Sequence, residues 1–138
     1  MAGRILVVED DEFIRDVLAT SLEDEGYDVD VAGSGRQVWQ YLAEVTPHMV
    51  LLDLALPEED GLSICRKLRL LPETAQVPVV FVSAMTQPMY LQAAAQAGGN
   101  GFIKKPFDID HVIATVAHFL AVPAAVNPGS SLSPTRPR

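Results

Sequence analysis

The chain has 138 residues, the length of one domain rather than two, and its hydrophobic share of 49% excludes a wholly disordered protein. Eighteen Asp and Glu against ten Lys and Arg give a net charge of −8, which argues against direct binding to nucleic acid and favours a bound cation. A single cysteine, Cys65, excludes an intrachain disulfide, and without a signal-peptide core or a long apolar run we expect a cytoplasmic protein that does not cross a membrane.

Short apolar runs alternate with longer amphipathic stretches five times along the chain. The apolar runs, which we expect to form strands, are 5–8, 28–31, 49–52, 79–82 and 101–103. The amphipathic stretches, which we expect to form helices, are 12–25, 35–44, 62–71, 89–97 and 109–120. The first, third and fourth runs are apolar throughout, as in strands covered on both faces, whereas the second alternates Asp with Val like an edge strand. This pattern predicts a doubly wound α/β fold with a parallel five-stranded sheet in the order 2-1-3-4-5.

Certain residues mark the expected boundaries of the helices and of the domain. Asp11, Ser34 and Asp108 are typical N-caps, and Gly26 and Gly98 are typical of the turn that ends a helix. After residue 121 the composition becomes rich in Pro, Ser and Gly. We therefore interpret residues 1–121 as the folded domain and residues 122–138 as a disordered tail or a truncated linker.

Polar residues follow four of the five predicted strands. They are Glu9, Asp10 and Asp11 after the first strand, Asp53 after the third, Ser83 after the fourth and Lys105 after the fifth. Ligands of doubly wound folds bind beyond the carboxyl ends of the strands, so we expect these side chains to line one crevice. Converging carboxylates repel one another unless a cation neutralises them, and Mg²⁺ prefers oxygen ligands. The sequence therefore predicts a magnesium site, with Mn²⁺ able to substitute.

The same crevice has the residue types needed for phosphoryl transfer. Asp53 precedes a loop, where its carboxylate can attack a phosphoryl group and form an aspartyl phosphate. Lys105 and the Ser83 hydroxyl can contact the phosphoryl oxygens while the cation neutralises the remaining charge. Any one of these residues alone would be read as a capping or surface residue. Their combined occurrence at one edge of the predicted sheet favours the chemical interpretation.

The chain contains four short motifs, which are ILVVED at 5–10, DLALPEEDG at 53–61, Ser83-Ala84, and Lys105-Pro106-Phe107. Together they resemble the motifs of response regulator receiver domains, and the resemblance covers about residues 4–121. It implies a flavodoxin-like (βα)5 fold and a cis Lys105-Pro106 bond. It also implies that Asp53 is the phosphoacceptor and that Lys105 is the phosphate-binding lysine. The metal would be held by Glu9, Asp10, Asp53 and the Ala55 backbone carbonyl, with Glu9 acting mainly through a metal-bound water. Ser83 would be the switch hydroxyl and Phe102 the switch aromatic.

The resemblance implies a signalling switch rather than a conventional turnover enzyme. The domain would catalyse its own phosphorylation and dephosphorylation, taking its phosphoryl group from a histidine kinase or a phosphotransfer protein. The output would be protein contact through the face made by the fourth helix, the fifth strand and the fifth helix, where no charged residue occurs from Thr86 to Asn100. We expect no direct binding to nucleic acid or membrane, and leave open a phosphorylation-dependent homodimer.

Two positions that influence dephosphorylation in this family correspond to Ala55 and Met85. Neither side chain can orient an attacking water by a good hydrogen bond, so we expect a long-lived phosphorylated form. Phe102 lacks a hydroxyl and can equally be a plain core residue.

Three other functions remain open or are disfavoured. The chain can be a receiver from a longer regulator whose output domain is absent, although we favour a stand-alone receiver. An aspartyl-phosphate phosphatase would share the nucleophile and the metal, but such enzymes usually need a second acid at the position of Ala55. A flavodoxin-type nucleotide binder is disfavoured because the first strand–helix loop, residues 9–12, is acidic and lacks glycine.

Overall fold

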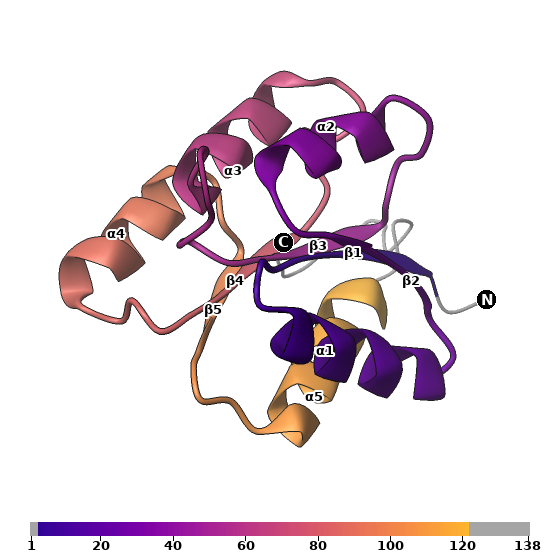
Figure 1. The fold of residues 1–138 in the computed structure, drawn as a ribbon. Helices are drawn as coiled ribbons and strands as arrows, with labels where there is room; N and C mark the ends of the chain where they lie inside the picture. The colour runs from indigo at the N-terminus through magenta and orange to yellow at the C-terminus, as the bar shows by residue number, and fades with distance from the viewer. Residues whose placement is uncertain (1–2, 122–138) are drawn as a thin grey trace, which may run out of the picture.

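Five strands and five helices alternate along the chain in the computed structural model, which describes residues 3–121 (Figure 1). The strands are β1 (Arg4–Val8), β2 (Asp28–Ala32), β3 (Met49–Leu52), β4 (Val79–Ser83) and β5 (Gly101–Lys104). The helices are α1 (Glu12–Asp24), α2 (Gly35–Leu42), α3 (Gly61–Leu70), α4 (Pro88–Gln96) and α5 (Ile109–Ala121). All strand pairs are parallel and the order is β2-β1-β3-β4-β5, which confirms the predicted fold class and strand order. The tail predicted at 122–138 lies outside the described residues.

The sheet is covered on both faces, with α1 and α5 on one side and α2, α3 and α4 on the other (Figure 1). Each face has its own apolar cluster: Val7 and Leu51 pack with residues of α1 and α5, whereas Leu52 and Phe81 pack with residues of the other three helices. The continuously apolar strands β3 and β4 are entirely buried, as the sequence predicted. β2 lies at an edge of the sheet, where the predicted edge strand belongs.

Side-chain caps explain where several helices begin. Asp11 and Ser34 accept hydrogen bonds from the backbone N–H groups three residues ahead, and Asp108 Oδ1 accepts one from Asp110 at 2.9 Å, which confirms all three predicted N-caps. Gly26 and Gly98 have positive φ angles of 97° and 105° just after α1 and α4, as expected of helix-ending glycines.

Some predicted helix ends are wrong by one or two residues. The second helix was expected to reach Glu44 but ends at Leu42, because the Glu44 N–H bonds to the Tyr41 carbonyl three residues back instead of to a carbonyl four residues back. The third begins at Gly61 rather than 62, because its cap is the preceding aspartate. Within residues 3–121, no helix combines the length and the apolar character needed to cross a bilayer.

Arg69 on α3 ties together three segments that are distant in sequence. Its guanidinium donates hydrogen bonds to the Gly98 carbonyl at 2.8 and 3.0 Å and to the Val77 carbonyl at 2.8 Å. It also donates to Asn100 Oδ1 at 2.9 Å, and that oxygen accepts a second bond from the Val79 N–H at the start of β4. Burial lowers the pKa of Arg69. The Arg69 guanidinium therefore donates to several backbone carbonyls at once and holds the turn between α4 and β5 against α3.

Replacing Arg69 with Met is expected to lower the free energy of unfolding by about 3 kcal/mol, because several carbonyls would lose a charged donor at once. Urea denaturation followed by circular dichroism measures this loss. The matched control is Arg66→Met on the same helix, where the side chain is exposed and the change should stay within about 0.5 kcal/mol. Equal losses in the two variants would show that the Arg69 hydrogen bonds do not stabilise the fold.

Candidate functional site

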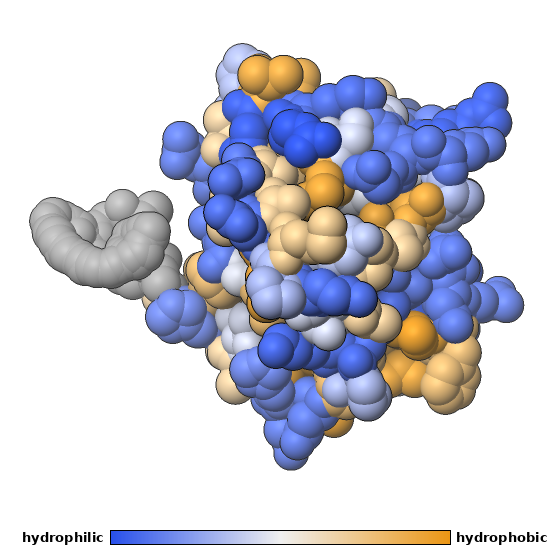
Figure 2. Space-filling model, turned by 90° about the vertical axis from the view of Figure 1, so that its left-hand side faces the viewer, coloured by the Kyte–Doolittle hydropathy of each residue, from blue (hydrophilic) through white to orange (hydrophobic). Residues whose placement is uncertain are grey.

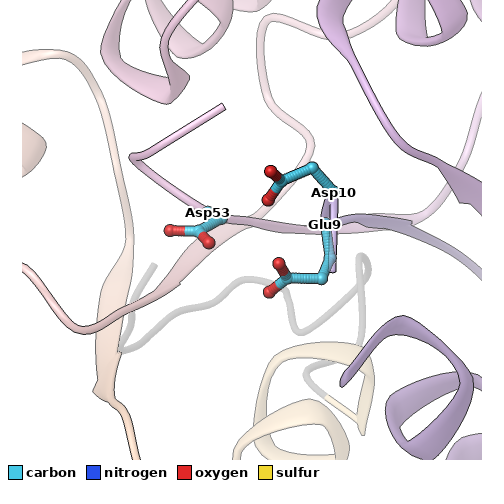
Figure 3. A group of neighbouring side chains, drawn as sticks. All are labelled: Glu9, Asp10 and Asp53. Carbon is cyan, nitrogen blue, oxygen red and sulfur yellow. The ribbon is translucent and has the colours of Figure 1, made fainter. Parts of the chain in front are cut away.

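Three carboxylates gather at the carboxyl ends of β1 and β3. Glu9 and Asp10 follow β1, Asp53 follows β3, and one oxygen from each lies within 4.8 Å of the others (Figure 3). Glu9 and Asp53 are only 2% and 5% exposed, whereas Asp10 is exposed to solvent. The structure thus brings together Glu9, Asp10 and Asp53, whereas the Asp11 side chain, expected at the same crevice, accepts the Ile14 N–H as the cap of α1.

The strand register explains this convergence. Val8 of β1 pairs with Leu52 of β3, and the Asp53 N–H donates to the Val8 carbonyl at 3.1 Å. Because the two strands run parallel, the next residues, Glu9 and Asp53, leave the sheet at the same level. The apolar runs predicted at 5–8 and 49–52 thus end side by side. The first polar residue after each run, Glu9 and Asp53, therefore becomes the neighbour of the other.

Lys105 completes the cluster. Its Nζ lies 2.6 Å from Glu9 Oε1 and 2.8 Å from Asp53 Oδ2, and its side chain is 15% exposed. Burial lowers the pKa of Lys105, but the hydrogen bonds and charges of Asp53 and Glu9 outweigh this effect and raise it overall. For Glu9, burial is the larger effect and raises the pKa despite the bond from Lys105. The Lys105-Pro106 bond is cis, as the resemblance implied.

The loop at 54–60 folds back on the phosphoacceptor candidate. The Ala55 N–H donates to Asp53 Oδ1 at 3.1 Å, and the Gly61 N–H donates to the Leu54 carbonyl at 2.9 Å. A Cβ at Gly61 would lie 2.1 Å from the Asp53 carbonyl oxygen, so only glycine permits this approach. The Ala55 backbone is thereby kept next to the Asp53 carboxylate.

Ser83 ends β4, and Phe102 lies inside the neighbouring strand β5, paired with Phe81. Ser83 is the last residue of β4 and is buried, with its Oγ accepting a hydrogen bond from the Met85 N–H at 3.2 Å. Phe102 in β5 is half-buried and packs beside Phe81 with 6.3 Å between ring centroids. Phe102 therefore contributes to the core edge, and its role as a switch aromatic stays a prediction.

These donors suit a hard divalent cation. All three acidic side chains offer oxygen, the ligand atom that Mg²⁺ and Mn²⁺ prefer. Three carboxylates face a single ammonium group, so the cluster lacks positive charge. The described residues therefore fit a divalent cation at this edge of the sheet.

Two residues near the site had no role in the sequence interpretation. Arg15 of α1 donates to the Glu9 carbonyl at 3.2 Å, and Glu59 in the loop after Asp53 accepts from side chains of both α2 and α3. The one available signal was Trp39, because an indole N–H in a folded domain usually needs an acceptor. Nothing in the sequence identified Glu59 as that acceptor.

Comparison with known proteins identifies relatives over most of the chain. The sequence model of the response regulator receiver domain matches residues 5–117. The DNA-binding dual master transcriptional regulator RpaA of Synechocystis is 34% identical over 117 residues, which cover 85% of this chain and 48% of RpaA. The DNA-binding response regulator MtrA of Mycobacterium tuberculosis is 37% identical over 116 residues, 84% of this chain and 50% of MtrA. The chain thus spans about half the length of these curated relatives.

Solved structures give the same result. A putative response regulator from Chloroflexus aurantiacus superposes with a TM-score of 0.83 at 29% identity, covering 88% of this chain and 99% of that one. The receiver domain of the sensor histidine kinase PA1611 from Pseudomonas aeruginosa, with a magnesium ion coordinated in its active-site cleft, superposes with a TM-score of 0.80 at 26% identity. The match covers 88% of this chain and 99% of that one. The chemotaxis regulator CheY4 of Vibrio cholerae, at 23% identity and a TM-score of 0.82 over 87% of this chain and all of its own, shares the fold.

Proposed function

The chain belongs to the response regulator receiver domain family, and from this premise we propose that it is a phosphorylation-dependent signalling switch with Asp53 as its phosphoacceptor. The observation that carries the proposal is the group of Glu9, Asp10 and Asp53, with Lys105 Nζ 2.6 Å from Glu9 Oε1 and 2.8 Å from Asp53 Oδ2. A buried carboxylate next to a fixed cationic donor is suited to receive a phosphoryl group.

The proposed reaction moves a phosphoryl group from a phosphohistidine of a histidine kinase or a phosphotransfer protein. An Asp53 carboxylate oxygen attacks phosphorus, the P–O bond forms as the P–N bond breaks, and the imidazole leaves and takes up a proton. Lys105 Nζ would donate to one phosphoryl oxygen and the Ser83 hydroxyl to another. The transferring phosphoryl group carries negative charge spread over its oxygens. Most of the catalysis therefore comes from positioning the reacting groups and neutralising that charge.

We assign the cation to Asp10, Asp53 and the Ala55 carbonyl, with Glu9 supporting it from the buried side. Mg²⁺ is the expected ion and Mn²⁺ a substitute. When bound, the ion supplies positive charge next to the phosphoryl oxygens. The magnesium in the cleft of the similar PA1611 receiver domain supports this assignment.

Intact-mass spectrometry after incubation with acetyl phosphate tests the proposal directly. We expect the native protein to gain one phosphoryl group with Mg²⁺ present, as the P–O bond to acetate breaks. No gain is expected when EDTA removes the cation. A protein that gains no mass with acetyl phosphate and Mg²⁺, nor with any other small phosphodonor, would not be a phosphorylated switch.

The proposed output surface is the face of α4, β5 and α5. Met89 in α4 is 66% exposed. Figure 2 looks onto the side of the molecule where α4 lies in Figure 1. It shows apolar and weakly polar side chains across the centre, with hydrophilic ones around them. We propose a downstream protein, or a second copy after phosphorylation, as the partner of this face. The half-length match to DNA-binding regulators favours a second candidate, in which residues 1–121 are the receiver of a longer regulator.

The phosphorylated form is expected to last about tenfold longer or more in the native protein than in an Ala55→Asn, Met85→Glu variant. Ala55 is exposed without a hydrogen-bonding side chain, and Met85 packs against the apolar cluster, so neither orients an attacking water. The decay of the mass gain after removal of acetyl phosphate measures the lifetime. Met89→Glu, an exposed change on α4, serves as control, and equal lifetimes in the native protein and the double variant would contradict the expectation.

A further inference from the structure

The Glu59 carboxylate is a meeting point of α2, α3 and the loop that follows Asp53. Its Oε1 accepts the Trp39 indole N–H of α2 at 2.9 Å. Its Oε2 accepts the Ser63 hydroxyl at 3.0 Å and lies 2.6 Å from Lys67 Nζ, both from α3. Lys67 Nζ also lies 5.8 Å from the centre of the Trp39 ring, so the two helices meet at this carboxylate.

The packing around Glu59 is close. A Cβ at Gly35, the first residue of α2, would come within 2.6 Å of Glu59 Oε1, so the carboxylate lies against the start of that helix. The hydrogen bond from Lys67 is the main cause of a lowered pKa for Glu59, with burial opposing it and Trp39 and Ser63 adding to the lowering. The side chain is therefore held in its ionised form between two helices.

The loop at 54–60 has few other attachments near its tip. At its base, the Gly61 N–H bonds to the Leu54 carbonyl, Leu56 packs on the apolar cluster, and Asp60 Oδ1 accepts the Ser63 N–H at 2.8 Å. Beyond that base, Pro57 and Glu58 are exposed, and Glu58 has a φ of 69°, a conformation that is rare outside glycine. The Glu59 side chain therefore anchors the half of the loop opposite Ala55.

We propose that Glu59 is a positioning residue, which through Trp39, Ser63 and Lys67 holds the loop at 54–60 in the conformation that presents the Ala55 carbonyl to the cation. This inference rests on the proposed function, because Ala55 matters only if the site binds a metal. Residues that hold a ligand in place typically change metal affinity by about tenfold or more when lost. Trp39 is the only tryptophan in the chain, so its fluorescence reports on this contact.

Calorimetric titration with MgCl₂ tests the proposal on the full chain. Glu59→Ala is expected to raise the Kd for Mg²⁺ about tenfold, and Glu59→Gln to recover part of the loss, because the amide oxygen can still accept from Trp39. The matched control is Glu58→Ala, which removes an equal charge from the adjacent exposed position and should leave the Kd unchanged. In the native protein and the control, Mg²⁺ should shift the wavelength of the Trp39 fluorescence emission, and the midpoint of this shift should equal the midpoint of the calorimetric titration. Glu59→Ala should show no such shift at saturating Mg²⁺.

A Glu59→Ala protein with the native Kd and a native Trp39 response would overturn the inference. If this variant fails to fold by circular dichroism, Trp39→Phe decides the question. A smaller aromatic ring remains, the indole N–H is lost, and the Kd should rise about threefold, whereas an unchanged Kd overturns the proposal. Native protein that gains a phosphoryl group while Glu59→Ala binds Mg²⁺ normally refutes only the role of Glu59. Native protein that neither binds Mg²⁺ nor gains a phosphoryl group refutes the proposed function, and the inference with it.

Discussion

Replacing Asp53 with Asn is expected to abolish the phosphoryl gain from acetyl phosphate and Mg²⁺. The amide is a poor nucleophile for phosphorus, while its size and shape keep the hydrogen bond from the Ala55 N–H available. The Asp53 side chain is 6% exposed and in contact with Lys105, an environment that Glu9 shares. Intact-mass spectrometry measures the loss, and circular dichroism verifies that the variant is folded.

Glu58→Gln is the matched control, because it neutralises an exposed carboxylate only five residues away in the same loop. It should gain the phosphoryl group as the native protein does. If Asp53→Asn still gains mass, peptide mapping locates the modified residue. Phosphorylation at another carboxylate with native yield would contradict the assignment of Asp53.

Replacing Lys105 with Met is expected to slow phosphorylation by acetyl phosphate about a hundredfold. Lys105 Nζ lies within 2.8 Å of Asp53 Oδ2 and 2.6 Å of Glu9 Oε1, where it can reach a phosphoryl oxygen on Asp53. Removing one preorganised donor to developing charge typically costs a factor of about 10² to 10³ in rate. The rate of mass gain at a fixed acetyl phosphate concentration measures the effect.

Lys104→Met provides the comparison, since Lys104 is the adjacent residue with the same charge and an exposed side chain. Its phosphorylation rate should stay within about twofold of the native rate, because exposed charges are screened by solvent. A native rate in Lys105→Met would mean that Lys105 neutralises the resting carboxylates without contributing to phosphoryl transfer.

The sequence predicted the parts of the site that lie at strand ends. Glu9, Asp53 and Lys105 each follow an apolar run, and parallel strands necessarily bring such positions to one edge. The acids and the lysine therefore meet because all the strands are parallel. The alternation of apolar runs with amphipathic stretches in the sequence predicts that topology. Residue roles such as metal ligand and switch aromatic came from the resemblance.

The sequence could not predict contacts made by side chains that leave regular elements. Phe102 had two equally good interpretations, and its half-buried position beside Phe81 depends on the register between β4 and β5. No sequence pattern gave Arg69 a role, because its partners lie up to 31 residues away in turns whose shape no periodic pattern describes. The ends of α2 and α3 shifted for a similar reason, since caps and turns compete with helical hydrogen bonds there.

By itself, the sequence determined the order of the elements, the two-layered covering of the sheet and the edge at which the acidic residues gather. These follow from periodicity and from the chain order of the runs, which are local properties. The tertiary structure alone decided which donors surround Glu59 and which carbonyls surround Arg69. Hydrogen bonds require partners within about 3 Å, and only the packing of segments that are distant in sequence brings them that close.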